Sequence, residues 1–108
     1  METTSLQETK YRGYLDDTCI ITGDCSICLF ILKNKEIKSV KIPFPELSNK
    51  IAEYADFIKI SQNMIINRNH FVEIYETKSR LILMEPENIL KVSRKNWNRF
   101  NAGIKQEL

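Results

Sequence analysis

The residue types in this sequence that most often do chemistry are three cysteines and a single histidine. Cys25 and Cys28 form a C-x-x-C pair with Cys19 shortly before it, and this spacing can bind zinc or carry out redox chemistry. No second pair follows, and His70 lies far along the chain. The pair falls within a predicted strand, where residues three apart point to opposite faces. The sequence therefore favours buried, apolar cysteines, with a metal or redox sensor as the alternative.

An enzyme needs a nucleophile with a base, a pair of carboxylates in a pocket, or a metal cluster. The spacing of this sequence assembles none of these, and it contains no glycine-rich phosphate loop. His70 stands beside a predicted turn, so we expect a structural or solvated side chain there. We predict that the protein is not an enzyme and has no catalytic residue, metal ligand, cofactor or small-molecule substrate.

Three polar clusters are better candidates for function. The first is the segment Lys59-Ile60-Ser61-Gln62-Asn63, which lies between two apolar strand candidates. Side-chain amides can pair with adenine in the major groove, and lysine contacts phosphate or guanine. Lys59, Ser61, Gln62 and Asn63 are therefore candidate contacts with nucleic acid. A polar connector between two strands is the alternative interpretation.

The second cluster is Ser93-Arg94-Lys95. If Ser93 caps a helix, Arg94 and Lys95 occupy its first turn and oppose the helix dipole by about 0.3–1 kcal/mol each. A phosphate bound at that N-terminus would use both cations and the free N–H groups. The alternative is that both side chains simply extend into water.

The third cluster is Asn67-Arg68-Asn69, which predicts a turn. Arg68 is a candidate phosphate contact, although a turn needs no such role. It lies in the basic half of the chain: residues 57–108 hold nine Lys and Arg and five Asp and Glu, whereas residues 1–56 hold seven and nine. We therefore expect a polyanionic partner to bind the C-terminal half.

The composition is that of an ordinary globular domain. The 108 residues are 43% hydrophobic and 28% charged, and this length supports one domain with one core. The longest apolar run, Ile27–Leu32, predicts a buried strand, because a membrane span needs about 20 residues. Residues 1–10 carry no apolar signal-peptide segment. We expect a cytoplasmic location and no membrane partner.

Hydrophobic periodicity predicts many short strands with one or two short helices, which places the fold in the mostly β (α+β) class. Strands are predicted at Thr18–Thr22, Cys25–Lys33, Glu36–Ile42, Phe57–Ile60, Met64–Asn67, Phe71–Thr77, Arg80–Glu85 and Ile89–Val92. One helix is predicted over Pro45–Ala55, with Tyr54 and Ala55 on its apolar face. A second is predicted after the N-cap Ser93.

Residues 1–15 are predicted to be a polar tail, with a short edge strand near Tyr11–Tyr14, and residues 16–108 to be the domain. The predicted core consists of Leu29, Ile31, Leu47, Ile51, Ile66, Val72, Ile74, Leu81, Leu83, Leu90, Val92 and Trp97.

Two segments resemble the LytTR DNA-binding domain of bacterial transcription regulators. Phe57–Asn67 (FIKISQNMIIN) is similar to its signature of an aromatic residue, a cation, an apolar residue, a polar triplet, further apolar residues and an asparagine. Leu90–Arg94 (LKVSR) is similar to the family's strand that ends in Val-Ser-Arg, and the helix after Pro45 matches the element before the signature. The resemblance extends over about residues 16–104.

This resemblance implies a LytTR-like fold of several small antiparallel sheets with one or two short helices. Its loops, rather than a recognition helix, would read successive major grooves. It implies Gln62 as a base contact with Ser61 and Asn63 beside it, and Arg94 as a second contact. A third contact would come from the turn near Asp24–Ser26.

The sequence departs from the family's pattern in three ways. The polar triplet often reads His-Arg-Ser, whereas Ser61-Gln62-Asn63 lacks that charge and would alter base preference. Asp24 opposes phosphate binding at the third contact. We also expect a stand-alone regulator, without the receiver domain that usually precedes this domain, so that phosphorylation of its own aspartate is not the switch.

The sequence thus predicts a bacterial transcription regulator that binds double-stranded DNA, as a homodimer or in pairs on direct repeats. Its predicted DNA contacts are Gln62, Asn63 and Arg94 on the bases, Ser61 beside them, and Lys59, Arg68 and Lys95 on the backbone. One alternative is a protein-interaction module on the same fold that pairs with or inhibits a DNA-binding relative.

Overall fold

The computed structural model describes residues 11–105, whose strands form two antiparallel sheets. The first sheet, in the order β3-β2-β1-β5-β4, contains β1 (Thr18–Gly23), β2 (Cys28–Leu32), β3 (Ile37–Val40), β4 (Phe57–Ser61) and β5 (Met64–Asn67). The second, in the order β6-β7-β8, contains β6 (Phe71–Glu76), β7 (Leu81–Met84) and β8 (Asn88–Lys91). The helical elements are α2 (Phe44–Ile51), α3 (Trp97–Lys105) and the 3₁₀ turns η1 (Leu15–Asp17), η2 (Arg68–His70) and η3 (Arg94–Asn96). The predicted mostly β class is confirmed.

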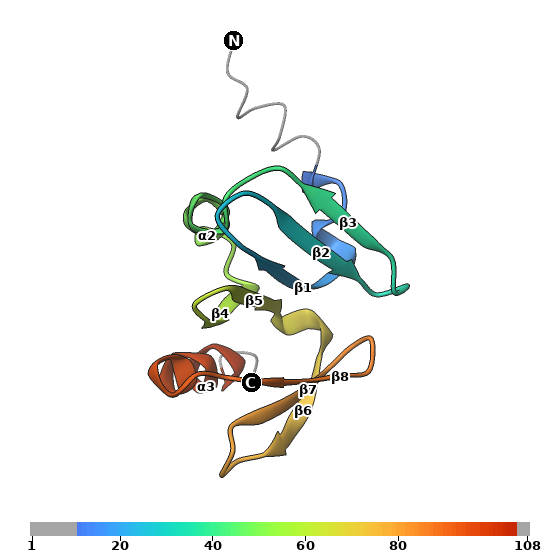
Figure 1. Cartoon of the computed structure of the whole chain (residues 1–108). Coiled ribbons are helices and arrows are strands. Elements are labelled where there is room, and N and C mark those ends of the chain that lie inside the picture. The colour runs from blue at the N-terminus through green and yellow to red at the C-terminus, as the bar shows by residue number, and fades with distance from the viewer. Residues whose placement is uncertain (1–10, 106–108) are drawn as a thin grey trace.

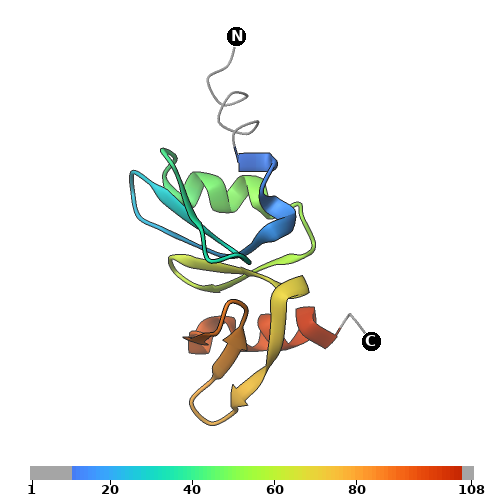
Figure 2. The ribbon, with the colours of Figure 1, turned by 90° about the vertical axis from the view of Figure 1, so that its right-hand side faces the viewer.

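The five-stranded sheet is the middle layer of the molecule (Figures 1 and 2). Helix α2 covers one face, and the second sheet and α3 cover the other. Adjacent residues of a strand point to opposite faces, so Ile21 and Ile65 belong to the cluster beneath α2, whereas Ile20 and Ile66 belong to the cluster beneath α3. The single core expected from chain length is therefore divided into two by this sheet.

The predicted register of β7 is wrong by one residue. Ile82 and Met84 are fully buried, whereas Leu81 and Leu83 are half-buried on the outer face. All four residues are apolar, so alternation within the strand carries no signal about which face is inside. The register comes from the pairing of Ile82 with Ile74 and Leu90 on the neighbouring strands.

Strand β2 shows the same error. Its buried residues are Cys28, Phe30 and Leu32, whereas the predicted Leu29 and Ile31 are half-buried. Of the remaining predicted core, Leu47, Ile51, Ile66 and Val92 are buried, and Leu90 and Trp97 are half-buried.

Val72 and Ile74 are wrong as core predictions, because their side chains are 50% and 38% exposed. Both lie on β6, which is an edge strand interrupted by two register shifts against β7. Such irregularities turn side chains away from the regular alternation. The apolar residues of β6 have the spacing of a half-buried strand, although β6 lies at the edge of its sheet.

Helix α2 begins one residue earlier than predicted, at Phe44, with Pro45 in its first turn where a missing N–H has no cost. It ends at Ile51 rather than Ala55. The Tyr54 N–H donates to the Ile51 carbonyl, which closes a turn into β4, and the Tyr54 ring packs edge-on against Phe57. Tyr54 is thus half-buried outside the helix, and Ala55 is exposed.

The edge strand predicted near residues 11–14 is wrong. Tyr11 and Arg12 are helical and lead through a turn into η1. Tyr11 is buried and stacks on Phe30 with ring centroids 5.5 Å apart. Tyr11 and Leu15 belong to the cluster beneath α2, so side chains on both sides of residue 16 share one core. The rest of the predicted tail, residues 1–10, lies outside the described residues.

Candidate functional site

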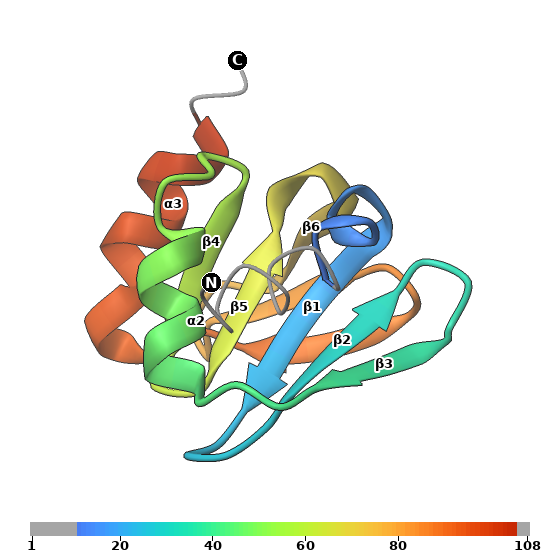
Figure 3. The same ribbon diagram turned by 90° about the horizontal axis from the view of Figure 1, so that it is seen from above.

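Three loops are held together at one edge of the molecule by hydrogen bonds to two backbone carbonyls. The carbonyl of Asn63, in the β4–β5 turn, accepts from the Gly23 N–H at 3.3 Å and from the Thr22 hydroxyl at 3.2 Å. The carbonyl of Ile60, just before that turn, accepts from the Ser93 N–H at 2.8 Å. The β4–β5 turn therefore lies between the β1–β2 turn and the segment after β8. Figure 3 shows the β1–β2 and β4–β5 turns at the same edge of the molecule.

The β4–β5 turn presents a polar tip. Gln62 and Asn63 are exposed, and the Ser61 hydroxyl is 3.2 Å from Asn63 Oδ1. Lys59 precedes them on β4, and its ammonium lies 5.9 Å from the centre of the Phe44 ring. The turn thus carries donors and acceptors beside a cation on a rigid strand pair.

A groove of about 560 Å³ lies where this turn meets the start of α3. Its lining residues are Lys59, Gln62, Ser93, Lys95, Asn96 and Arg99. Within residues 11–105, the three cations Lys59, Lys95 and Arg99 form no ion pair with a carboxylate. We refer to this surface as the basic groove, and its unneutralised charge suits an anion.

The basic groove unites some of the predicted site residues and leaves others outside. Lys59, Gln62 and Lys95 line it. Ser61 and Asn63 flank Gln62 on the same turn, and Arg94 is exposed next to Lys95 without lining the groove.

Arg68 lies apart from the basic groove. Its Nε donates to Asp56 at 3.3 Å, and its Nη1 donates to the Gly103 carbonyl at 3.0 Å. Only 16% of the side chain is exposed. Arg68 joins η2 to the end of α3, and the predicted turn at residues 67–69 is confirmed as η2 with Asn67 as its cap.

Arg99 is the cation of the groove that sequence reasoning missed. It follows Lys95 by four residues, a spacing that places two side chains on the same side of a continuous helix. The apolar periodicity of this segment predicts the helix but does not indicate Arg99, whereas the spacing from Lys95 does. The buried Asn96, which also lines the groove, has no comparable sequence signal.

The predicted side-chain cap at Ser93 is wrong. Ser93 precedes the 3₁₀ turn η3 rather than α3 directly, and its hydroxyl makes no capping bond to the backbone. The Ser93 Oγ instead accepts from the Asn96 side-chain amide at 2.7 Å, while the Ser93 carbonyl accepts from the Asn96 N–H at 3.0 Å. The polar side chains are therefore used to fix the loop that carries Arg94 and Lys95.

The β1–β2 turn is organised by Asp24. Its carboxylate accepts from the Ser26 N–H at 2.9 Å, the Ile27 N–H at 3.0 Å and the Ser26 hydroxyl at 3.2 Å. These hydrogen bonds, led by the one from the Ser26 N–H, hold the pKa of Asp24 below its ordinary value. The turn therefore keeps a negative charge at the edge where the sequence predicted a third contact.

The cysteines and the histidine do not assemble a catalytic or metal site. Cys19 and Cys28 are buried, as predicted, but Cys25 is exposed before β2. Within residues 11–105, no group of three potential ligands could hold a metal ion. The His70 ring connects two segments of the fold: Nε2 lies 2.9 Å from the Asp16 carbonyl oxygen, and Nδ1 lies 3.3 Å from Glu85 Oε1. No helix within these residues is both long and apolar enough to cross a membrane.

Comparison with known proteins identifies the fold. No protein-family model matches the sequence, and no curated protein does. Among solved structures, one similar chain is the LytTR DNA-binding domain of a protein described as a methyl-accepting/DNA response regulator from Bacillus cereus. The two chains are 19% identical, and the match covers 82% of each with a TM-score of 0.68. The chain therefore has the fold of a LytTR DNA-binding domain, as the resemblance of its sequence predicted.

Proposed function

We propose that this chain binds duplex DNA sequence-specifically as a bacterial transcription regulator. The observation that carries the proposal is the basic groove, in which three cations without carboxylate partners among residues 11–105 line the same surface as Gln62 of the β4–β5 turn. Cations that contact phosphates supply most of the affinity for DNA, and amides supply base recognition. The LytTR-like fold agrees with this combination.

The proposed roles follow from position. Gln62 and Asn63 are exposed at the tip of the turn and would reach base edges, with Ser61 beside them. Arg94 projects from the adjacent loop and would make the second base contact. A bidentate amide or guanidinium contact contributes about 1–3 kcal/mol of discrimination between bases.

Lys59, Lys95 and Arg99 would contact phosphates along the groove. We leave Arg68 out of this interface, because its guanidinium is bound to Asp56 and to the Gly103 carbonyl. Its proposed role is to support the end of α3.

The test begins with selection of bound sequences from a random duplex pool, which also reveals any repeated half-site. Titrations at several salt concentrations then compare a selected duplex with a scrambled one. Gln62→Ala should lower the ratio of the two affinities by about five- to a hundredfold. If that ratio is unchanged, Gln62 does not read bases.

Lys95→Ala should weaken binding to both duplexes alike and reduce the salt slope by about one unit. The matched control is Lys33→Ala, since Lys33 is exposed at the opposite end of β2 from the β1–β2 turn. Equal losses for Lys33→Ala and Lys95→Ala would mean that the groove has no special role.

A second candidate function is protein interaction on the same fold. Val72, Ile74, Tyr75 and Ile89 are large apolar side chains that β6 and β8 leave exposed. Exposed apolar side chains on sheet strands are available to a protein partner, and they mark an interaction surface where they are contiguous. The absence of a mobility shift with every duplex at low salt would favour this candidate over DNA binding.

A further inference from the structure

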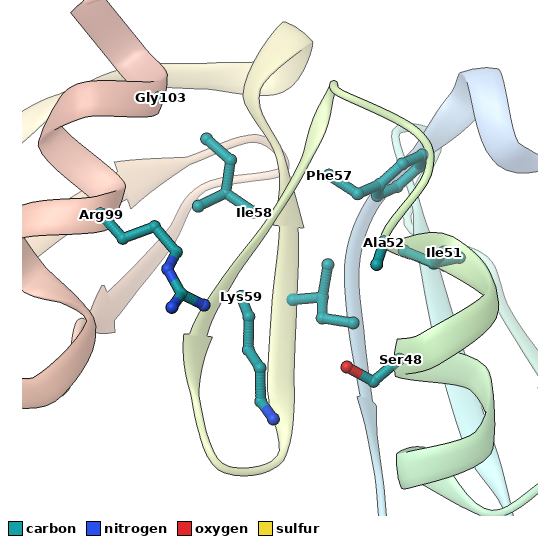
Figure 4. Close-up of a pocket in the computed structure, with 9 residues that line it drawn as sticks. Ser48, Ile51, Ala52, Phe57, Ile58, Lys59, Arg99 and Gly103 are labelled. Carbon is teal, nitrogen blue, oxygen red and sulfur yellow. The ribbon is translucent and has the colours of Figure 1, made fainter.

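A second cavity of about 250 Å³ adjoins the basic groove (Figure 4). It lies between α2 and α3 along the edge strand β4, and its lining is mostly apolar. Phe57, Ile58 and Ile65 contribute the apolar part from β4 and β5. Neither phosphates nor base edges would use such a surface, so DNA binding alone gives this cavity no role.

Two positions in the walls of the cavity carry small residues. Ala52 stands at the end of α2, and Gly103 stands on α3. A Cβ at Gly103 would lie 2.7 Å from Ile58 Cδ1, so glycine permits the close approach of α3 to β4. A larger residue at position 52 would fill part of the cavity, whereas a side chain at position 103 would push α3 away from β4.

Two cations stand where this cavity meets the basic groove. Lys59 and Arg99 line both. Figure 4 shows the Arg99 guanidinium extending from α3 toward Lys59, with the Ser48 hydroxyl directed toward the same region from α2. The cavity therefore has an apolar interior and a cationic opening, a polarity that matches an amphipathic anion.

We propose that this cavity binds a small apolar carboxylate, whose hydrocarbon part enters the apolar interior and whose carboxylate lies between Lys59 and Arg99. The volume is below the range of about 300–1,000 Å³ that is typical for drug-sized ligands, which limits the occupant to a short chain or a single ring system. Charge-assisted hydrogen bonds from both cations would fix the carboxylate.

A regulatory consequence follows, and this part rests on the proposed function. Lys59 and Arg99 cannot contact DNA phosphates while they hold the carboxylate. The bound ligand would therefore lower the affinity of the protein for DNA, which would make it an effector.

The binding test is independent of DNA. Sodium octanoate is titrated into the full chain and followed by methyl and amide NMR, with uncharged octanamide as the matched probe. Octanoate should produce saturable shifts at Ile58 and Ile65, and octanamide should bind at least about tenfold more weakly, as expected for loss of a charge-assisted hydrogen bond. Equal affinity for the two probes, or no saturable shift with octanoate, would overturn the proposal.

Two variants locate the ligand. Ala52→Leu should fill the cavity and abolish the shifts. Ala55→Leu is the matched control, because both alanines are exposed but only Ala52 lines the cavity. Arg99→Gln leaves the cavity open and should weaken octanoate about tenfold while leaving octanamide unchanged. Octanoate binding that survives both Ala52→Leu and Arg99→Gln would overturn the assignment to this cavity.

The DNA arm separates the two proposals. Saturating octanoate should raise the apparent Kd of the unaltered chain for a selected duplex and should leave that of Ala52→Leu unchanged. If octanoate binds but the apparent Kd stays the same, the effector role is overturned. If octanoate binds but no duplex does, the cavity assignment stands and the proposed function fails.

Discussion

The backbone N–H of Ser93 donates to the carbonyl oxygen of Ile60 over 2.8 Å. This one hydrogen bond joins the chain after β8 to the end of β4 and brings Lys59 and Lys95 into the same groove. Because both partners are backbone groups, this hydrogen bond itself requires no particular side chain at positions 60 and 93. The basic groove is thus a product of strand pairing and of this cross-link.

Arg99 should behave as a phosphate contact. Arg99→Gln is expected to weaken binding to selected and scrambled duplexes by the same factor and to reduce the salt slope by about one unit. The measurement is a salt titration by fluorescence anisotropy, with Lys33→Gln as the control. A selective loss on the selected duplex would instead assign Arg99 to base recognition.

Removal of the charge on Asp24 should strengthen DNA binding. In Asp24→Asn the Oδ1 acceptor that organises the turn is kept, while one negative charge at the proposed interface is lost. We expect a rise in affinity of roughly twofold at low salt, which disappears at high salt because exposed charges are screened. Asp24→Ala loses the acceptor as well, so its turn should be destabilised, and NMR shifts at Ser26 and Ile27 distinguish the two effects.

The corrected register of β7 can be tested by a pair of substitutions. Ile82 is fully buried in the core, so Ile82→Ala should lower the free energy of unfolding by about 2–5 kcal/mol. Leu83 lies half-buried on the outer face, so Leu83→Ala should cost about 1 kcal/mol. Urea denaturation with unchanged m-values measures both. A larger loss of unfolding free energy for Leu83→Ala than for Ile82→Ala would support the register expected from the sequence.

The three cysteines should differ in reactivity. Cys25 is exposed and should react with a thiol reagent at pH 8, whereas the buried Cys19 and Cys28 should react only after unfolding. Burial raises the pKa of both buried thiols from the ordinary value of 9.0 to about 11. Rapid labelling of all three thiols in the folded protein would contradict the structure.

The same pKa shifts predict a pH dependence of stability. Between about pH 9 and pH 11 the unfolded chain releases thiol protons that the folded chain keeps, so stability contributed by these thiols is complete below pH 9 and is lost as pH rises toward 11. Lysines also titrate there, so the control is a Cys19→Ala, Cys28→Ala variant. Its unfolding free energy should fall less steeply over this range.

The fold was predictable from sequence at the level of elements. Each observed strand overlaps a predicted strand, because turns such as Gly23-Asp24 and Asn34-Lys35 separate the apolar runs. The faces were not predictable in β2 and β7, because their runs are apolar at every position and only the packed neighbours decide which side is buried. The end of α2 was also missed, since Tyr54 keeps helical spacing while it packs on Phe57 after the helix has ended.

The candidate site was predictable in part. Lys59, Gln62 and Lys95 could be selected because their residue types suit nucleic acid and their segments resemble a known signature. Their proximity could not, because it depends on the Ser93–Ile60 hydrogen bond between segments far apart in sequence. Arg68 has the residue type and the turn position of a phosphate contact, yet only the structure shows it bound to Asp56.

The β4–β5 turn is fixed at both ends through its backbone, by the Ile60 carbonyl on one side and the Asn63 carbonyl on the other. Residues 61 and 62 therefore stand in a frame that does not depend on their identity. Under the proposed function, substitutions there would change which bases the tip contacts without moving the strands that carry it. An inserted residue, by contrast, would pull one of the two carbonyls away from its donor. The turn can thus diversify by exchange of side chains and resists changes of length, which makes it a natural position for engineering new specificity.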